Sequence, residues 1–205
     1  MTKESKLRMK KITFLTFGLM VLFSVFLVGC STAQATTNTP VVTSSSSTAA
    51  SAETILTIKK GDKTVTYTMA ELKALTVVSG WGGKSTMHGS EAPAQFKGVA
   101  MSQLLKSVGG MTDKDSLVVT AKDNYSRTLT FDQVVNGNFT VMDNSGNAVT
   151  PSKTPVLFVA YEQNGGILDT DSGTIMLGIM TAQNQLTGGD NWVRDLNKIE
   201  VITAQ

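Results

Sequence analysis

The sequence predicts one α+β domain of about 150 residues, with a mixed β-sheet and three or four short helices. Three observations predict this class. Short runs of β-branched and aromatic residues dominate the chain from residue 53 onward, and turn-forming Gly, Asn and Asp separate them. Two Thr-x-x-Glu or Thr-x-x-Gln motifs mark helix starts. The predicted helices are too few to alternate regularly with the strands, which argues against a repeated βαβ pattern.

The domain begins with a predicted β-hairpin and a short helix. Ile55–Ile58 and Thr64–Tyr67 are β-rich runs that flank a Gly-containing turn. Thr68 stands three residues before Glu71, and this spacing is that of a capping box. It predicts a helix from Met69 to near Val77.

The stretch Ser79–Ser90 has no apolar period of either helix or strand. It holds four glycines, together with Trp81 and the only histidine of the chain, His88. We expect an irregular loop here. Glycines in such a loop let the backbone approach a ligand closely.

The rest of the domain reads as one more amphipathic helix, one short capped helix and six strands. Met101–Val108 has apolar residues at helical spacing, and Gly109-Gly110 supplies the stop. Thr130 and Gln133 repeat the capping pattern, and Asn164-Gly165 is a strong hairpin-turn signal. The predicted strands are Leu117–Thr120, Tyr125–Leu129, Phe139–Met142, Pro155–Tyr161, Thr174–Met180 and Lys198–Ile202.

The chain begins with a pattern typical of export. A basic start precedes the apolar run Ile12–Val28, and Leu27-Val28-Gly29-Cys30 follows, with Ser31 behind it. This arrangement resembles the lipobox of bacterial lipoproteins, in which the cysteine is acylated and becomes the first residue of the mature protein. The resemblance implies lipidation of Cys30, with acyl chains such as palmitate. The alternative is a retained transmembrane anchor with an ordinary cysteine at its end, although about 17 residues is short for a bilayer.

These patterns divide the chain into three parts: 1–29 as a lipoprotein signal peptide, 30–52 as a Ser/Thr-rich tether, and 53–205 as the globular domain. The tether has almost no charge and few large apolar residues, so its composition is that of a flexible spacer. We therefore expect a protein held at the cell membrane by lipid on Cys30, with its domain outside the cytoplasm. The sequence leaves open which membrane holds the anchor.

Composition excludes several classes of partner and chemistry. Five basic residues and one acidic residue precede Cys30, so the mature chain has a net charge of about −2 and no basic stripe for nucleic acid. Cys30 is the only cysteine, so the domain has no disulfide framework. A single histidine and no thiol within the domain also leave no residues for a hydrolase triad.

The segment Val159–Leu168 contains A-Y-E-Q-N-G-G-I-L, which resembles the A-Y-E-x-N-G-x-x-L segment of the molybdopterin-binding domain of the sulfite oxidase family. Four further pieces resemble that family in the same order along the chain: Tyr67–Lys73, Phe96–Leu105, Asp123–Ser126 and Asn191–Val201. Together the pieces cover roughly Ile55 to Ile202. The resemblance implies the mixed-sheet α+β fold of that domain.

The chain departs from the family's pattern at the metal. The resemblance implies that a molybdenum-ligating cysteine precedes the element at Phe96–Leu105, but Ser79–Gln95 contains none. A serine cannot replace a soft sulfur ligand without changing the affinity for the metal. The basic donors near by are Lys84 and Lys97, and Ser172–Met176 lacks the arginine that relatives carry there. Relatives of this fold without the cysteine look like binding or accessory modules, so no cofactor is predicted. The resemblance leaves molybdopterin as the alternative.

If a ligand pocket lies where the family holds its cofactor, four aromatic or basic side chains would line it: Trp81, His88, Tyr125 and Arg127. Each has an ordinary alternative. Trp81 can cap the domain's own core, and Arg127 can be a surface arginine. His88 with Met87 and Met101 has the donors of a soft-metal site, but a surface histidine and core methionines explain the same residues. No metal site and no catalytic residue are predicted.

Three functions therefore follow from the sequence. The first is a non-catalytic binding or accessory module at the cell surface, whose partner is a small ligand or an envelope protein. The second is an envelope oxidoreductase that holds molybdopterin without the usual cysteine. The third is a structural surface protein without a small ligand. The sequence does not identify the ligand or the oligomeric state.

Overall fold

The computed structural model describes residues 53–204. The predicted signal peptide 1–29, the predicted lipidation site Cys30 and the predicted tether 30–52 lie outside the described residues. Within residues 53–204, no helix is long and apolar enough to cross a membrane.

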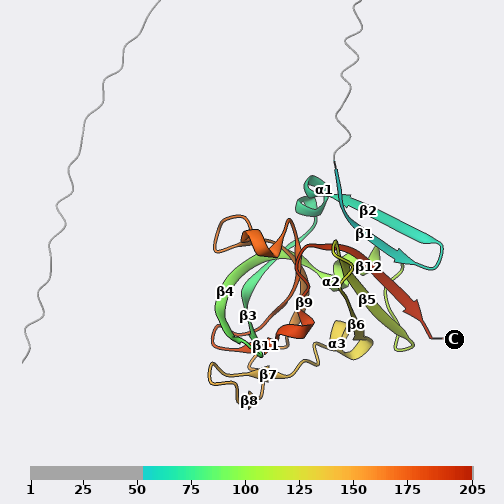
Figure 1. Cartoon of the computed structure of the whole chain (residues 1–205). Helices are drawn as coiled ribbons and strands as arrows, with labels where there is room; N and C mark the ends of the chain where they lie inside the picture. The colour runs from blue at the N-terminus through green and yellow to red at the C-terminus, as the bar shows by residue number, and fades with distance from the viewer. Residues whose placement is uncertain (1–52, 205) are drawn as a thin grey trace, which may run out of the picture. The chain divides into compact units, whose positions relative to one another are not determined.

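The described residues form two β-sheets that lie side by side (Figure 1). The first has five strands in the order β2-β1-β12-β5-β6. Its central pairing joins the two ends of the domain, because β1 runs parallel to β12 with Ile58 opposite Ile199. Its strands are β1 Thr54–Lys60, β2 Lys63–Thr68, β5 Asp115–Ala121, β6 Ser126–Thr130 and β12 Leu196–Thr203.

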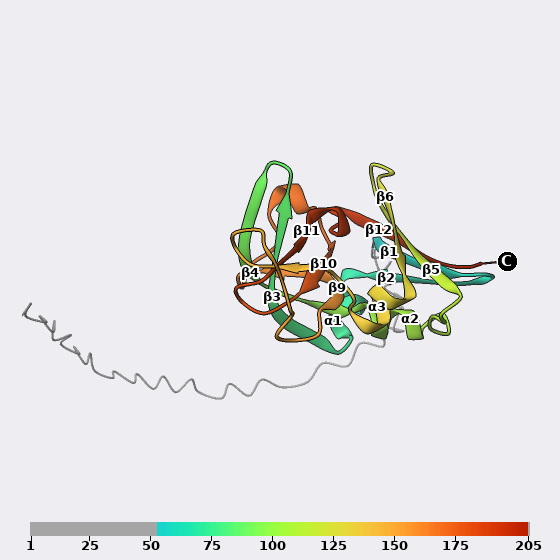
Figure 2. The same ribbon diagram turned by 90° about the horizontal axis from the view of Figure 1, so that it is seen from below.

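The second sheet has seven strands in the order β10-β9-β4-β3-β11-β7-β8. A long curved hairpin, β3–β4, forms its middle, as Figure 2 shows from below. β9 pairs with both β4 and β10, and its residues Leu157–Tyr161 are buried. The strands are β3 Val77–Thr86, β4 Gly89–Ala100, β7 Val141–Met142, β8 Ala148–Val149, β9 Val156–Gln163, β10 Met176–Met180 and β11 Leu186–Gly188.

Three short helices pack beside the sheets: α1 Met69–Ala74, α2 Met101–Lys106 and α3 Phe131–Asn136. Both predicted capping boxes are present, at Thr68 with Glu71 and at Thr130 with Gln133. α2 packs against β4 and β9, whereas α3 contacts β5, β6 and β9, so these two helices connect the sheets. Two single 3₁₀ turns complete the fold, η1 Thr170–Ser172 and η2 Gly189–Asn191.

One hydrophobic core runs through both sheets. Its fully buried side chains come from elements of both sheets and from α1 and α2, among them Leu56, Leu72, Leu104, Leu117 and Phe158. Because α2 presents Met101, Leu104 and Leu105 to this core, the predicted helical spacing there is confirmed. The α+β class with three short helices is also confirmed.

The predicted irregular loop at Ser79–Ser90 is wrong, since these residues belong to the β3–β4 hairpin. Gly89 follows the hairpin turn with a positive φ, but Gly82 and Gly83 have a packing role. A Cβ on Gly82 would lie 2.9 Å from the Ile179 carbonyl oxygen, and one on Gly83 would lie 2.6 Å from a Leu186 methyl. Neighbouring strands pack so closely against the hairpin at these two positions that only glycine fits. Because glycine replaces the apolar side chains there, the sequence lacks the alternation typical of a strand.

Smaller differences follow from local backbone geometry. α1 ends at Ala74 and not near Val77, because Leu75 is extended and its N–H caps the Leu72 carbonyl. The predicted strand at Phe139–Met142 is reduced to Val141–Met142. Asn164-Gly165 does form the predicted tight turn after β9, with positive φ at both residues.

Candidate functional site

Two adjoining hollows surround Trp81, and we call them together the Trp81 groove. Their volumes are about 420 and 340 Å³, and they share Ser79, Gly80, Trp81 and Lys153. β3 and β4 form its floor. The Trp81 backbone is fixed on both sides, since it pairs with Gln95 of β4 and its carbonyl accepts a 2.8 Å hydrogen bond from the Thr181 N–H.

The groove has an aromatic wall and mostly basic charge. Trp81 is half-buried and Met180 lies near by on β10. Lys97 and Glu162 form an ion pair of 3.3 Å across β4 and β9, while Lys153 is exposed and makes no ion pair with residues 53–204. One lysine is therefore left to attract an anion, beside a ring on which a flat group can stack.

Arg127 is engaged within the protein. Its Nη2 donates to the Asp190 carboxylate at 2.7 Å and to the Asn191 side-chain oxygen at 3.2 Å. This contact joins β6 of one sheet to η2, which follows β11 of the other. Arg127, predicted to line a ligand pocket, thus pairs with the chain's own Asp190.

His88 and Tyr125 lie at the far end of the β3–β4 hairpin from Trp81. His88 is in the two-residue turn of the hairpin and is exposed. Tyr125 precedes β6 and is 48% exposed. The hollow next to His88 and the hollow next to Tyr125 share Thr86 and Gly189, so these two side chains lie over neighbouring parts of one surface.

The four predicted site residues therefore do not share one pocket. Trp81 and Thr86 are both on β3, five residues apart, which is about 16 Å along an extended strand. Trp81 has its own groove, whereas His88, Tyr125 and Arg127 gather around the hairpin end and η2. Lys153, a groove residue that the sequence reasoning missed, lies in a loop with no pattern that could have indicated it.

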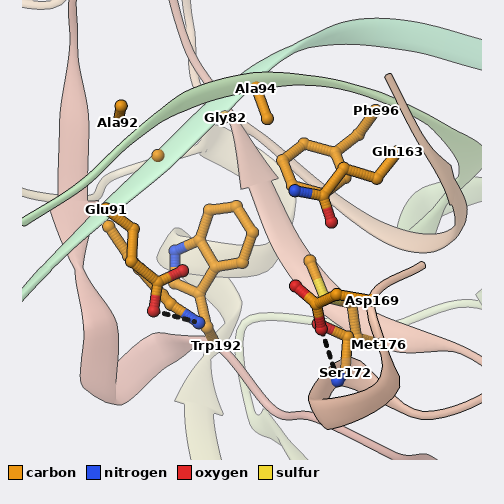
Figure 3. Close-up of a pocket in the computed structure, with 12 residues that line it drawn as sticks. Gly82, Glu91, Ala92, Ala94, Phe96, Gln163, Asp169, Ser172, Met176 and Trp192 are labelled. Carbon is orange, nitrogen blue, oxygen red and sulfur yellow. Dashed lines mark hydrogen bonds and ion pairs between the residues drawn. The ribbon is translucent and has the colours of Figure 1, made fainter. Parts of the chain in front are cut away.

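A further hollow, behind Trp192, is small, with a volume of about 20 Å³. Trp192, Phe96 and Met176 provide its apolar lining, and Figure 3 shows Glu91 and Asp169 on opposite sides of Trp192. Figure 3 also shows Asp169 beside Ser172, whose N–H donates to the carboxylate at 2.7 Å. Hydrogen bonding by Ser172 lowers the pKa of Asp169 against the opposing effect of burial.

The basic side of this cavity is Lys84, which is only 7% exposed. Its ammonium lies 3.2 Å from the Glu91 carboxylate and 5.8 Å from the centre of the Trp192 ring. Arg194 also pairs with Glu91 at 3.2 Å. Lys84 and Arg194 thus have their counter-charge within the cluster, and the cavity has room for about one water molecule. We therefore interpret the cluster as a contact that stabilises the hairpin and not as a binding site.

The residues of the Trp81 groove do not fit a thiolate-bound molybdenum centre. Cys30 is the only cysteine of the chain, so the domain offers no soft sulfur anion. Among residues 53–204 no three His, Cys, Asp or Glu side chains come together in a way that could hold a metal ion. The groove does retain the kind of donors that suit the organic part of a cofactor: a lysine for an anionic group and an indole for a flat ring.

No protein-family model matches the chain, and no curated protein matches it. Solved structures do resemble it. One is the sulfane dehydrogenase SoxCD from Paracoccus pantotrophus, with a TM-score of 0.50 and 14% identity over 71% of this chain. The match covers 37% of that chain, so the present protein spans little more than a third of the enzyme's length. At this identity the likeness shows the fold alone, and it supports the molybdopterin-domain-like fold that the resemblance in the sequence implied.

Proposed function

We propose that this protein is a lipid-anchored binding or accessory module, displayed outside the cytoplasm, which uses the Trp81 groove to hold a small ligand and does not catalyse a reaction. The fold resembles that of a domain found in an oxidoreductase. The observation that carries the proposal is the composition of the groove: it has an indole and a lysine that makes no ion pair within residues 53–204, and the domain has no cysteine.

The ligand class follows from the charges and shapes in the groove. Trp81 offers a face for a planar group, and Met180 offers a polarisable neighbour. Lys153 adds positive charge that the Lys97–Glu162 pair does not cancel. The ligand is therefore a planar molecule that carries a negative charge.

Flavin mononucleotide and riboflavin provide a matched pair of probes, because they share the ring and differ by a phosphate. Equilibrium dialysis of the full chain should show tighter binding of flavin mononucleotide, by about tenfold for one charge-assisted contact. Lys153→Gln should abolish this preference, whereas Lys106→Gln, an exposed lysine on α2, should leave it unchanged. Equal binding of the two probes by the unmodified protein, or binding of neither, would contradict the anionic-ligand proposal.

The anchor is tested separately. Cells grown with an alkyne analogue of palmitate should label the unmodified protein, and Cys30→Ser should remove the label. Ser31→Ala, next to the acylated position, should keep it. Labelling that survives Cys30→Ser would contradict lipidation at this residue.

The alternative function, an envelope oxidoreductase that holds molybdopterin, predicts bound molybdenum. Protein purified from its native envelope would then contain molybdenum at about one atom per chain, measured by inductively coupled plasma mass spectrometry. Under the proposal made above, the molybdenum content stays at background, and the protein does not oxidise sulfite.

A further inference from the structure

The turn of the β3–β4 hairpin exposes two side chains without a structural partner. Met87 is 97% exposed, which is unusual for a large apolar side chain, and His88 beside it is exposed as well. The turn itself is held by Thr86, whose hydroxyl accepts from the His88 N–H at 3.2 Å and donates to the Gly89 carbonyl at 2.9 Å. The His88 ring makes no hydrogen bond to another residue within 53–204.

A second methionine reaches the same place from a distant part of the chain. Met142 of β7 lines one hollow of about 630 Å³ together with Met87 and His88. β11 separates β7 from β3, with Met142 opposite Leu186 and Ser85 opposite Gly188. β3 and β7 are thus two strand spacings apart, about 10 Å.

The strand between them leaves this space open. Gly188 and Gly189 line the hollow and have no side chains to fill it. A Cβ on Gly189 would lie 2.6 Å from the Thr86 methyl, so the packing at this position requires glycine. Two flexible thioethers can therefore meet over a glycine floor, next to the imidazole.

We propose that Met87, His88 and Met142 form a binding site for Cu(I). Two thioethers and one imidazole are soft, neutral donors, which favour Cu(I) over Zn(II), Mg(II) or Ca(II). The nearest carboxylate, Asp190, is already paired with Arg127 at 2.7 Å. The donor set therefore carries no negative charge of its own, which suits a soft monovalent ion. This site is separate from the Trp81 groove and does not depend on the function proposed for it.

Competition for Cu(I) against the chromophoric chelator bathocuproine disulfonate tests the site. The protein is the full chain in mild detergent under nitrogen with ascorbate, and it carries Cys30→Ser throughout so that the thiol cannot bind copper. We expect one Cu(I) per chain. Met87→Leu and Met142→Leu keep the apolar surface and remove one sulfur each, and each should weaken binding by about tenfold.

His88→Gln should weaken binding further, whereas Met111→Leu should not change it, because Met111 is partly buried against the core away from the hollow. Silver(I), a soft ion without redox chemistry, should shift the NMR signals of the Met87 and Met142 methyl groups and leave that of Met111 in place. The proposal is overturned if the protein takes no Cu(I) from the chelator. It is also overturned if Zn(II) binds the hollow equally well, or if Met111→Leu weakens binding as much as Met87→Leu.

Discussion

Replacement of Asp115 by asparagine should lower the stability of the domain more than replacement of an exposed charged residue would. The Asp115 side chain is 1% exposed and lies at the start of β5. Its carboxylate accepts hydrogen bonds from Lys60 at 2.9 Å, from the Thr112 N–H at 2.7 Å and from the Thr203 hydroxyl at 2.6 Å. These partners come from β1, from the loop after α2 and from the end of β12, so one side chain connects the three central strands of the five-stranded sheet.

The expected loss of stability follows from the interactions that asparagine cannot make at this position. An asparagine keeps one acceptor oxygen, but its NH₂ group faces donors, and Lys60 loses its counter-charge. Breaking a buried pair of this kind costs about 3 kcal/mol. With an unfolding entropy near 2.1 cal/mol/K per residue over roughly 150 residues, this lowers the Tm by about 9 °C.

The effect should depend on pH with a definite sign. Burial raises the pKa of Asp115, but hydrogen bonds from Thr203, Thr112 and Lys60 outweigh it and hold the pKa well below the ordinary 3.8. A carboxyl group with a lowered folded-state pKa stabilises the protein above its unfolded pKa and loses that contribution as the pH falls towards the folded one. The difference in Tm between the unmodified protein and Asp115→Asn is therefore full at pH 7 and shrinks below about pH 4.

Differential scanning calorimetry between pH 7 and pH 2.5 measures this difference. Asp113→Asn is the matched control, since Asp113 is exposed and only two residues away; its Tm should change by no more than about 2 °C. A Tm difference for Asp115→Asn that stays constant down to pH 2.5 would refute the reasoning about its ionised state. An equal loss in the control would refute the reasoning about its burial.

Two further substitutions test close packing and helix capping. Gly98→Ala should destabilise the domain by at least about 3 kcal/mol in urea unfolding, because its Cβ would lie 2.0 Å from the Val159 carbonyl oxygen and backbone cannot yield as a side chain does; Gly166→Ala, whose nearest atom lies at 3.8 Å, is the control and should unfold as the unmodified protein does. Thr130→Ala should cost about 1 kcal/mol in the same assay through loss of the capping box with Gln133, and an unchanged urea midpoint would show that α3 does not need this cap.

The parts of the fold that the sequence predicted well are those whose causes are local. Both capping boxes formed because Thr68 and Thr130 need only a partner three residues away. The Asn164-Gly165 turn formed because both residues tolerate positive φ. The buried strand β9 was visible as a continuous apolar run.

The sequence did not indicate the β3–β4 hairpin, because its glycines pack against residues that are distant in the sequence. Gly82 faces Ile179 and Gly83 faces Leu186, about a hundred residues later in the chain. No local pattern reports such a contact. For the same reason, nothing near Lys153 or Met142 in the sequence indicated that they line the hollows next to Trp81 and His88.

Residue types and short spacings were enough to predict the α+β class, the helix starts, the lack of a thiolate within the domain and the export pattern that ends at Cys30. Tertiary structure decided which side chains meet. It separated Trp81 from His88 along one hairpin, paired Arg127 with Asp190, and placed Met142 and Met87 around the same hollow. The physical reason is that caps and turns are made within four residues, whereas a binding site depends on strand order and register, which the whole core determines at once.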